Sequence, residues 1–193
     1  SYVRQLVREG REKMQEAIIE KLPKNLKGTR ILDAGCGTGV LSRMLDERGA
    51  EVVGVDISDK LIEVAKNRSR SNSNIEYFAG DMKEKSFGNF DYIVAMDSLI
   101  HYSPEDVISS IAEFSKRANY SVLFTVIPST FALRTKLSLG KYFPKSERSP
   151  EVVPIEWGQL RQLEDLKINA CLEKIKRIKS FFYVSEVWEL ANK

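Results

Sequence analysis

Three glycines and two acids near residue 35 have the types and the spacing to bind a nucleoside. The run from Asp33 to Gly39 reads Asp-Ala-Gly-Cys-Gly-Thr-Gly, and Asp56 closes the later apolar run Glu51-Val52-Val53-Gly54-Val55. Glycine has no Cβ, so the backbone of such a loop can pass close to a ligand. A carboxylate about twenty residues further on can accept both hydrogen bonds of a ribose diol. The pattern predicts a nucleoside-binding half-site, and the alternative is a tight turn that needs glycine for its geometry alone.

The positions of the glycines distinguish two kinds of nucleoside ligand. Dinucleotide folds use Gly-x-Gly-x-x-Gly, whose amides hold a pyrophosphate at a helix N-terminus. Here the third position is Val40, and the last glycine is Gly39. Asp33 would also place a negative charge beside a pyrophosphate, whereas it suits a ligand with an ammonium and a sulfonium group. The run resembles motif I of S-adenosylmethionine-dependent methyltransferases, and a nucleotide-dependent oxidoreductase is the less favoured alternative.

The composition is typical of one folded domain. Of 193 residues, 42% are hydrophobic and 30% are charged, and no apolar run approaches the length of a membrane span. A net charge of +3 does not favour nucleic acid as a partner. The single histidine and the two distant cysteines, Cys36 and Cys171, predict neither a metal site nor a disulfide. We expect a reducing, cytoplasmic location, without a signal peptide. The chain begins at Ser1, as expected of a trimmed N-terminus.

Strand and helix patterns alternate along the chain. Apolar residues at helical spacing predict a first helix from Val3 to Leu22, which Pro23 ends. Ser58 and Ser103 are expected N-caps of later helices. Strands are expected at 30–34, 51–55, 75–78, 90–95 and 120–126, helices at 39–48, 58–67, from 103 onward and at 156–166, and a final strand pair at 168–178 and 181–190.

These alternating units predict an α/β protein with a Rossmann-like, seven-stranded, mostly parallel, doubly wound sheet that ends in an antiparallel hairpin. In such sheets the ligand lies outside the carboxyl ends of the strands. Four acids fall at or just beyond these ends: Asp33, Asp56, Asp81 and Asp97. We expect residues 1–193 to form a single domain, with a lid helix at 1–23 and an acceptor-binding segment at 128–155.

The methyltransferase resemblance implies where the methionine and ribose parts of the cofactor bind. Asp33 and the backbone of Gly35, Cys36, Gly37 and Gly39 should line the methionine part. Asp56 should accept the ribose hydroxyls.

The adenine and the cofactor ammonium should be held by the following segments. Ile57 should lie flat against the adenine, and Asp81 should accept from its exocyclic amine. Met82 should supply a backbone amide and pack on the ring. The Met96 carbonyl should meet the cofactor ammonium. Two alternatives are that Asp81 caps a helix and that Met96 is part of the core.

Three further segments resemble one methyltransferase family. They read Ala-Met-Asp-Ser-Leu-Ile-His-Tyr at 95–102, Leu-Phe-Thr-Val-Ile-Pro-Ser-Thr at 123–130 with Gly-Lys-Tyr-Phe-Pro at 140–144, and Ser-Phe-Phe-Tyr-Val-Ser at 180–185. These segments resemble the magnesium-protoporphyrin IX O-methyltransferases of chlorophyll biosynthesis, and the resemblance runs from about Val3 to the C-terminus. It implies methylation of one propionate carboxylate of a metalloporphyrin.

The same resemblance implies that His101 is catalytic. A propionate with an ordinary pKa near 4 is already ionised at neutral pH, so a hydrogen bond that orients it is the favoured role. General base catalysis on a protonated fraction and axial ligation of the porphyrin magnesium are the other roles. The alternative without function is a helix-capping or exposed histidine.

The acceptor contacts are expected from Tyr102, Thr125, Pro128, Arg134, Phe143 and Arg148. Apolar and basic residues interleave after Pro128, so this segment could form one wall of a porphyrin slot, with Arg134 or Arg148 on a propionate. The alternative is an amphipathic helix with a solvated basic face.

The resemblance also implies partners and rivals. The large subunit of magnesium chelatase is the expected partner, which would deliver the porphyrin, and contact with a membrane surface is expected without an integral segment. The main rival is an O-methyltransferase for another carboxylic acid or phenol. A catalytically silent porphyrin carrier is a further rival.

Overall fold

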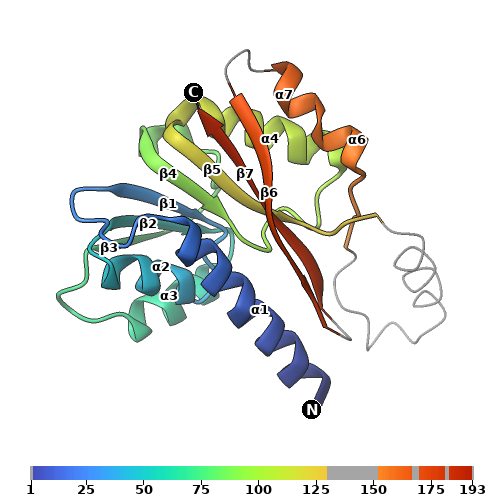
Figure 1. Cartoon of the computed structure of the whole chain (residues 1–193). Coiled ribbons are helices and arrows are strands. Elements are labelled where there is room, and N and C mark those ends of the chain that lie inside the picture. The colour runs from blue at the N-terminus through green and yellow to red at the C-terminus, as the bar shows by residue number, and fades with distance from the viewer. Residues whose placement is uncertain (1, 130–151, 167–169, 181–182, 193) are drawn as a thin grey trace.

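The chain folds around one seven-stranded sheet with helices on both faces, as the computed structural model shows (Figure 1). The structure describes residues 2–129, 152–166, 170–180 and 183–192. The strand order is β3-β2-β1-β4-β5-β7-β6, in which β7 is antiparallel to both of its neighbours, β5 and β6, and the other pairs are parallel. The predicted fold class is confirmed. In chain order the strands are β1 (Arg30–Ala34), β2 (Glu51–Asp56), β3 (Ile75–Ala79), β4 (Phe90–Ala95), β5 (Ala118–Val126), β6 (Ala170–Lys179) and β7 (Val184–Asn192).

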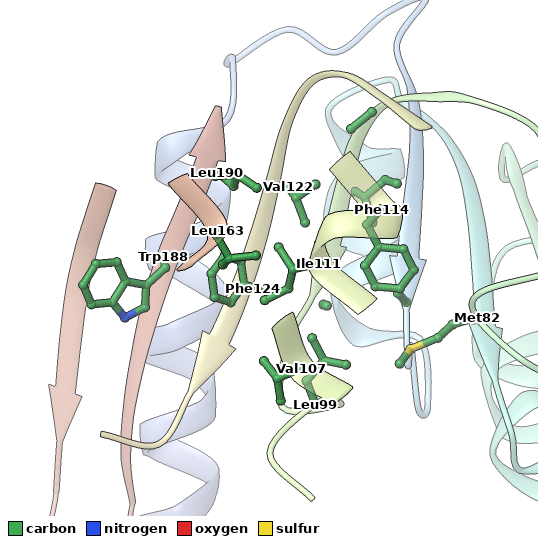
Figure 2. Close-up of a cluster of buried hydrophobic side chains, with 14 of the residues drawn as sticks. Met82, Leu99, Val107, Ile111, Phe114, Val122, Phe124, Leu163, Trp188 and Leu190 are labelled. Carbon is green, nitrogen blue, oxygen red and sulfur yellow. The ribbon is translucent and has the colours of Figure 1, made fainter. Parts of the chain in front are cut away.

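The central strands are mostly apolar because both faces of the sheet are covered. Successive side chains of a strand point to opposite faces. Ile31 accordingly joins the core cluster with the first helix, whereas Leu32 joins the cluster on the other face. Figure 2 shows that second cluster, in which Ile111 of α4 lies next to Phe124 of β5.

The helices follow the predicted pattern, with two differences. Ser58 accepts from the Leu61 amide and Ser103 accepts from the Asp106 amide, which confirms both N-caps. The helix expected at 156–166 is interrupted at Arg161. The segment after Asp81 forms only a short 3-10 turn instead of an α-helix. The helices are α1 (Tyr2–Lys21), α2 (Val40–Glu47), α3 (Asp59–Arg68), α4 (Pro104–Arg117), α6 (Trp157–Leu160) and α7 (Gln162–Leu166), and the turn is η1 (Lys85–Phe87).

The two halves of α1 have different surroundings. In the second half Met14, Ala17 and Ile18 are at most 2% exposed and pack on the sheet between α2 and the β6–β7 hairpin. The described side chains of the first turns are mostly exposed. The second half therefore belongs to the core, because moving it would expose these apolar side chains to water. A lid role for α1 stays a prediction, and it is limited to the first half.

The connection between β6 and β7 lies at the carboxyl edge of the sheet, whereas the end of the chain lies beside the start of β5. A hydrogen bond of 2.7 Å from the Ser180 amide to the Tyr183 carbonyl oxygen lies at the turn of this hairpin. β7 is antiparallel to β5, so β7 begins where β5 ends. The turn therefore lies at the same edge of the sheet as the ends of β1, β2 and β4, which is where the predicted site residues gather.

Candidate cofactor and acceptor site

The glycine loop joins β1 to α2 and is held against the end of β2. The amides of Gly35 and Cys36 donate to the Val55 carbonyl oxygen at 2.7 and 3.0 Å. The Gly37 amide donates to Asp56 Oδ2 at 2.9 Å. Gly35, Gly37 and Gly39 all have φ between 55° and 79°, a left-handed conformation that favours glycine. The loop is thus held by bonds from its backbone amides to the Val55 carbonyl oxygen and the Asp56 carboxylate at the end of β2.

At two of the three glycines, a neighbouring protein side chain leaves no room for a Cβ. A Cβ on Gly35 would collide with Ser98, and a Cβ on Gly39 would collide with the Tyr77 hydroxyl. Around Gly37, in contrast, no described atom lies within 4 Å of the position that a Cβ would take. The open space above the loop is therefore at Gly37, beside Asp56, and a ligand can approach the backbone there.

Asp56 joins the loop to the start of α3. Its Oδ2 accepts from Gly37, and its Oδ1 accepts from the Ser58 amide at 2.9 Å. Each carboxylate oxygen keeps a second lone pair, so both oxygens can accept from a ribose diol. The next residue, Ile57, is 81% exposed, an unusual state for isoleucine. Asp56 and Ile57 therefore present a polar and an apolar group side by side, and their contacts with ribose and adenine stay predictions.

Asp33 lies under the loop and not on its open side. Its carboxylate is 2% exposed, and the Ser42 hydroxyl of α2 donates to Oδ2 at 2.6 Å. Burial raises the pKa of Asp33 to about 6, although the hydrogen bonds from Ser42 oppose the shift. The prediction that this side chain lines the methionine part is corrected, because the strand points it into the protein. An effect of Asp33 on a cationic ligand through its charge stays a prediction.

Cys36 contributes its backbone alone. The thiol is 9% exposed and packs with Ile62, Ala65 and Tyr77 in a small cluster under α3. Burial raises the pKa of the Cys36 thiol far above its usual range. The thiol is therefore neutral and not a nucleophile.

The residues predicted to contact the adenine and the cofactor ammonium differ in how exposed their side chains are. Asp81 is exposed, and its Oδ1 accepts from the Lys83 amide in a turn, so the helix-cap alternative is wrong. Met82 is 7% exposed and lies in the core (Figure 2), so its side chain is not available to pack on an adenine ring. Met96 is partly buried against the core cluster that contains α1. Backbone contacts of Met82 and Met96 with the cofactor stay predictions.

The acceptor-side residues lie on the loop between β4 and α4. His101 is exposed and Tyr102 is 38% exposed. The loop is braced by a bond from the Tyr102 amide to the Leu99 carbonyl oxygen at 3.1 Å and by a bond from the Val153 amide to the Ile100 carbonyl oxygen at 2.8 Å. His101 and Tyr102 are thus presented at the carboxyl edge, as predicted.

Two predicted acceptor contacts are wrong because the residues are buried. Thr125 is 0% exposed, and its hydroxyl hydrogen-bonds to Asp97. Pro128 is buried where 127–129 pairs with the segment around Ile155. Arg134, Phe143 and Arg148, with most of the segment 128–155, lie outside the described residues.

A hollow of about 410 Å³ opens beside this loop. It is lined by Pro104 at the start of α4, by Ser129 and Pro154, and by Glu156 and Gln159 at the start of α6. Pro104 is three positions after His101 along the chain. The hollow therefore adjoins the end of the loop that carries the predicted catalytic residue, although His101 is not among the residues that line it.

A group of residues around Asp97 was not among those predicted from the sequence. The Asp97 carboxylate accepts from Tyr183 Oη, Thr125 Oγ1 and Arg11 Nε. Burial, followed by the charge of Asp97, raises the pKa of the Tyr183 phenol. Ser98 Oγ is buried and has no hydrogen-bond partner among the described residues. No local pattern signals these contacts, since Arg11 and Tyr183 are each 86 residues from Asp97.

Within the described residues, no group of three His, Cys, Asp or Glu side chains could hold a metal ion. The helices of the same residues include none that is long and apolar enough to cross a membrane.

Comparison with known proteins assigns the chain to a family. A family model for the C-terminus of magnesium-protoporphyrin IX methyltransferase matches residues 95–192, and a general methyltransferase-domain model matches 31–118. A magnesium-protoporphyrin O-methyltransferase of Rhodobacter capsulatus is 44% identical over 191 residues, which cover 98% of this chain and 84% of that protein.

Two more distant similarities are one in sequence and one in structure. A ubiquinone biosynthesis O-methyltransferase of Coxiella burnetii is 39% identical over 110 residues, which cover 55% of this chain and 47% of that protein. The crystal structure of magnesium protoporphyrin IX methyltransferase from Synechocystis with bound SAH has a TM-score of 0.88 and 24% identity, covering 100% of this chain and 88% of that one. The structural likeness establishes the fold, and the Rhodobacter relative and the family model establish that this chain belongs to the magnesium-protoporphyrin IX methyltransferase family.

Proposed function

We propose that this chain transfers the methyl group of S-adenosylmethionine to a propionate carboxylate of magnesium protoporphyrin IX. The observation that carries the proposal is the extent of the similarity. The alignment with the Rhodobacter enzyme, at 44% identity, covers 98% of the chain. The family model covers the His101 loop and the β6–β7 hairpin. These acceptor-side segments are where methyltransferases of one fold differ in substrate.

The described residues fit S-adenosylmethionine. The open backbone at Gly37 and the Asp56 carboxylate suit a ribose, and exposed Ile57 suits an adenine face. The buried charge of Asp33 suits a cation, since an anion there would be repelled. Ser98 Oγ, buried beside Gly35 without a described partner, offers a hydrogen bond to the methionine end.

The reaction depends more on the alignment of the reacting atoms than on proton transfer. When bound, S-adenosylmethionine supplies a methyl group that its sulfonium already activates. The propionate is ionised at neutral pH, so the chain has to hold its oxygen in line with the methyl carbon and the sulfur. Such alignment lowers a barrier by roughly 7–11 kcal/mol. His101, exposed at the carboxyl edge, would donate a hydrogen bond that orients the propionate.

The acceptor side supports a porphyrin over a small phenol. The ubiquinone-pathway relative matches 55% of this chain, whereas the Rhodobacter porphyrin enzyme matches nearly all of it. We place the porphyrin along the hollow between α4 and α6, next to the His101 loop. Arg134 and Arg148 remain the proposed cationic anchors for a propionate.

Product analysis tests the proposal. The protein is incubated with S-adenosylmethionine and magnesium protoporphyrin, and products are separated and identified by mass spectrometry. We expect one added methyl group, as an ester, and no product from the dimethyl ester of the same porphyrin. Methylation of a phenol or another acid alone would favour the rival enzyme. A shifted Soret band without methylated product would favour the silent carrier.

The proposal also includes the location and the partners of the protein. A reducing, cytoplasmic location is supported by two free cysteines, Cys36 and Cys171. Contact with a membrane surface and delivery of the porphyrin by the large subunit of magnesium chelatase stay predictions from the family resemblance.

A further inference from the structure

Asp97 has a strained backbone at the start of the loop that carries His101. It is the one non-glycine among the described residues with a positive φ, 52°. Such a conformation is costly for a residue with a Cβ, and it persists where the surroundings impose it. The Asp97 amide donates to Thr125 Oγ1 at 2.7 Å, and this bond ties the start of the turn to β5.

The carboxylate of Asp97 joins three elements that are distant in sequence. The side chain is 4% exposed. Arg11 Nε of α1 donates to Oδ2 at 3.0 Å, and Thr125 Oγ1 of β5 donates to Oδ1 at 3.2 Å. The hydroxyl of Tyr183, at the start of β7, lies 3.1 and 3.2 Å from the two oxygens. A buried carboxylate is tolerated when it is paired and hydrogen-bonded in this way.

The packing of α1 fits the same arrangement. A Cβ on Gly10 would lie 2.6 Å from the Tyr183 ring, so glycine lets the helix approach this tyrosine closely. The next residue, Arg11, then reaches Asp97. Beyond this point the first turns of α1 continue past the core toward the N-terminus (Figure 1).

The chain after Asp97 leads directly into both halves of the site. Ser98 packs against Gly35 of the cofactor loop, and Leu99 is 1% exposed. His101 and Tyr102 follow on the acceptor side. A change in the turn at Asp97 would therefore move the cofactor contact and the acceptor contact together.

We infer that Asp97 is a positioning residue for methyl transfer, and that Arg11 and Tyr183 set it in place. Its carboxylate holds α1, β5 and the β6–β7 hairpin in the one arrangement that fixes the His101 loop against the glycine loop. The inference deepens the proposed function and rests on it for the catalytic readout. Because the Arg11 side chain is 55% exposed, replacing Arg11 leaves the hydrophobic core intact.

The test compares Arg11→Gln and Tyr183→Phe with a matched control, Arg8→Gln. Arg8 lies on the same helix and pairs with Glu12, so its loss changes the net charge equally. Amide hydrogen exchange is measured on the full chain with and without SAH. We expect exchange at 98–103 to rise about fivefold or more in Arg11→Gln and in Tyr183→Phe, and to stay within about twofold in Arg8→Gln. This readout does not depend on the acceptor, so it holds even if the proposed function fails.

Kinetics with magnesium protoporphyrin complete the test. We expect Arg11→Gln to lower kcat about fivefold or more and to raise the SAH dissociation constant by a smaller factor, with the thermal midpoint near the wild-type value, and Arg11→Lys to recover part of the loss. Unchanged exchange at 98–103 in Arg11→Gln and Tyr183→Phe would overturn the inference. So would a fall in kcat that only follows a fall in thermal midpoint, because that pattern marks a merely structural contact.

Discussion

Replacing Asp33 with asparagine should stabilise the protein, and more so as the pH rises. Asp33 is fully buried beneath the glycine loop, and its pKa is raised from 3.8 to about 6, chiefly by burial. Because the folded-state pKa lies above the unfolded value, this group stabilises the fold most below pH 3.8. That contribution is lost as the pH rises through 6. Above pH 6 the folded protein therefore holds a buried charge that the unfolded chain would solvate.

The two pKa values give the size of the effect. Linkage makes the penalty about 3 kcal/mol at pH 8 and about half of that at pH 5. The stability difference between Asp33→Asn and wild type should thus grow by about 1 kcal/mol from pH 5 to pH 8. Changes in shape or in the Ser42 hydrogen bond affect both pH values alike, so they cancel in this comparison.

Urea unfolding at pH 5 and pH 8 measures the effect, followed by the fluorescence of Trp157 and Trp188. Asp59→Asn is the control, since it removes an exposed carboxylate and changes the net charge equally. A stability difference for Asp33→Asn that is the same at both pH values would refute the reasoning. We also expect this variant to lose more affinity for S-adenosylmethionine than for SAH, because the buried negative charge favours the cation.

The other predictions concern the two ends of the site. Asp56→Ala removes the acceptor for the Gly37 and Ser58 amides as well as the ribose contact, so the SAH dissociation constant measured by calorimetry should rise about tenfold or more; an unchanged value would contradict the assignment. His101→Ala should lower turnover of magnesium protoporphyrin about 100-fold, while SAH affinity stays within about twofold. Wild-type turnover in that variant would remove His101 from the mechanism.

Local features of the sequence were enough to predict the order of the elements and the edge that carries the site. The periodicity of apolar residues predicts helices and strands because it reflects which face of each element is buried. Ser58 and Ser103 predict helix starts because capping bonds reach only three residues. Asp56 and Ile57 could be assigned because a strand end and its next residue face the ligand edge whatever the rest of the chain does.

The tertiary structure decided which of the candidate side chains face a ligand. Asp33, Met82 and Thr125 belong to plausible motifs, yet each points into the protein, since its direction depends on neighbouring elements that the motif does not contain. The group around Asp97 was invisible for the same reason: its partners come from α1, β5 and β7. Sequence patterns record bonds between near neighbours and the burial of faces, whereas contacts across 86 residues exist only after the sheet has formed.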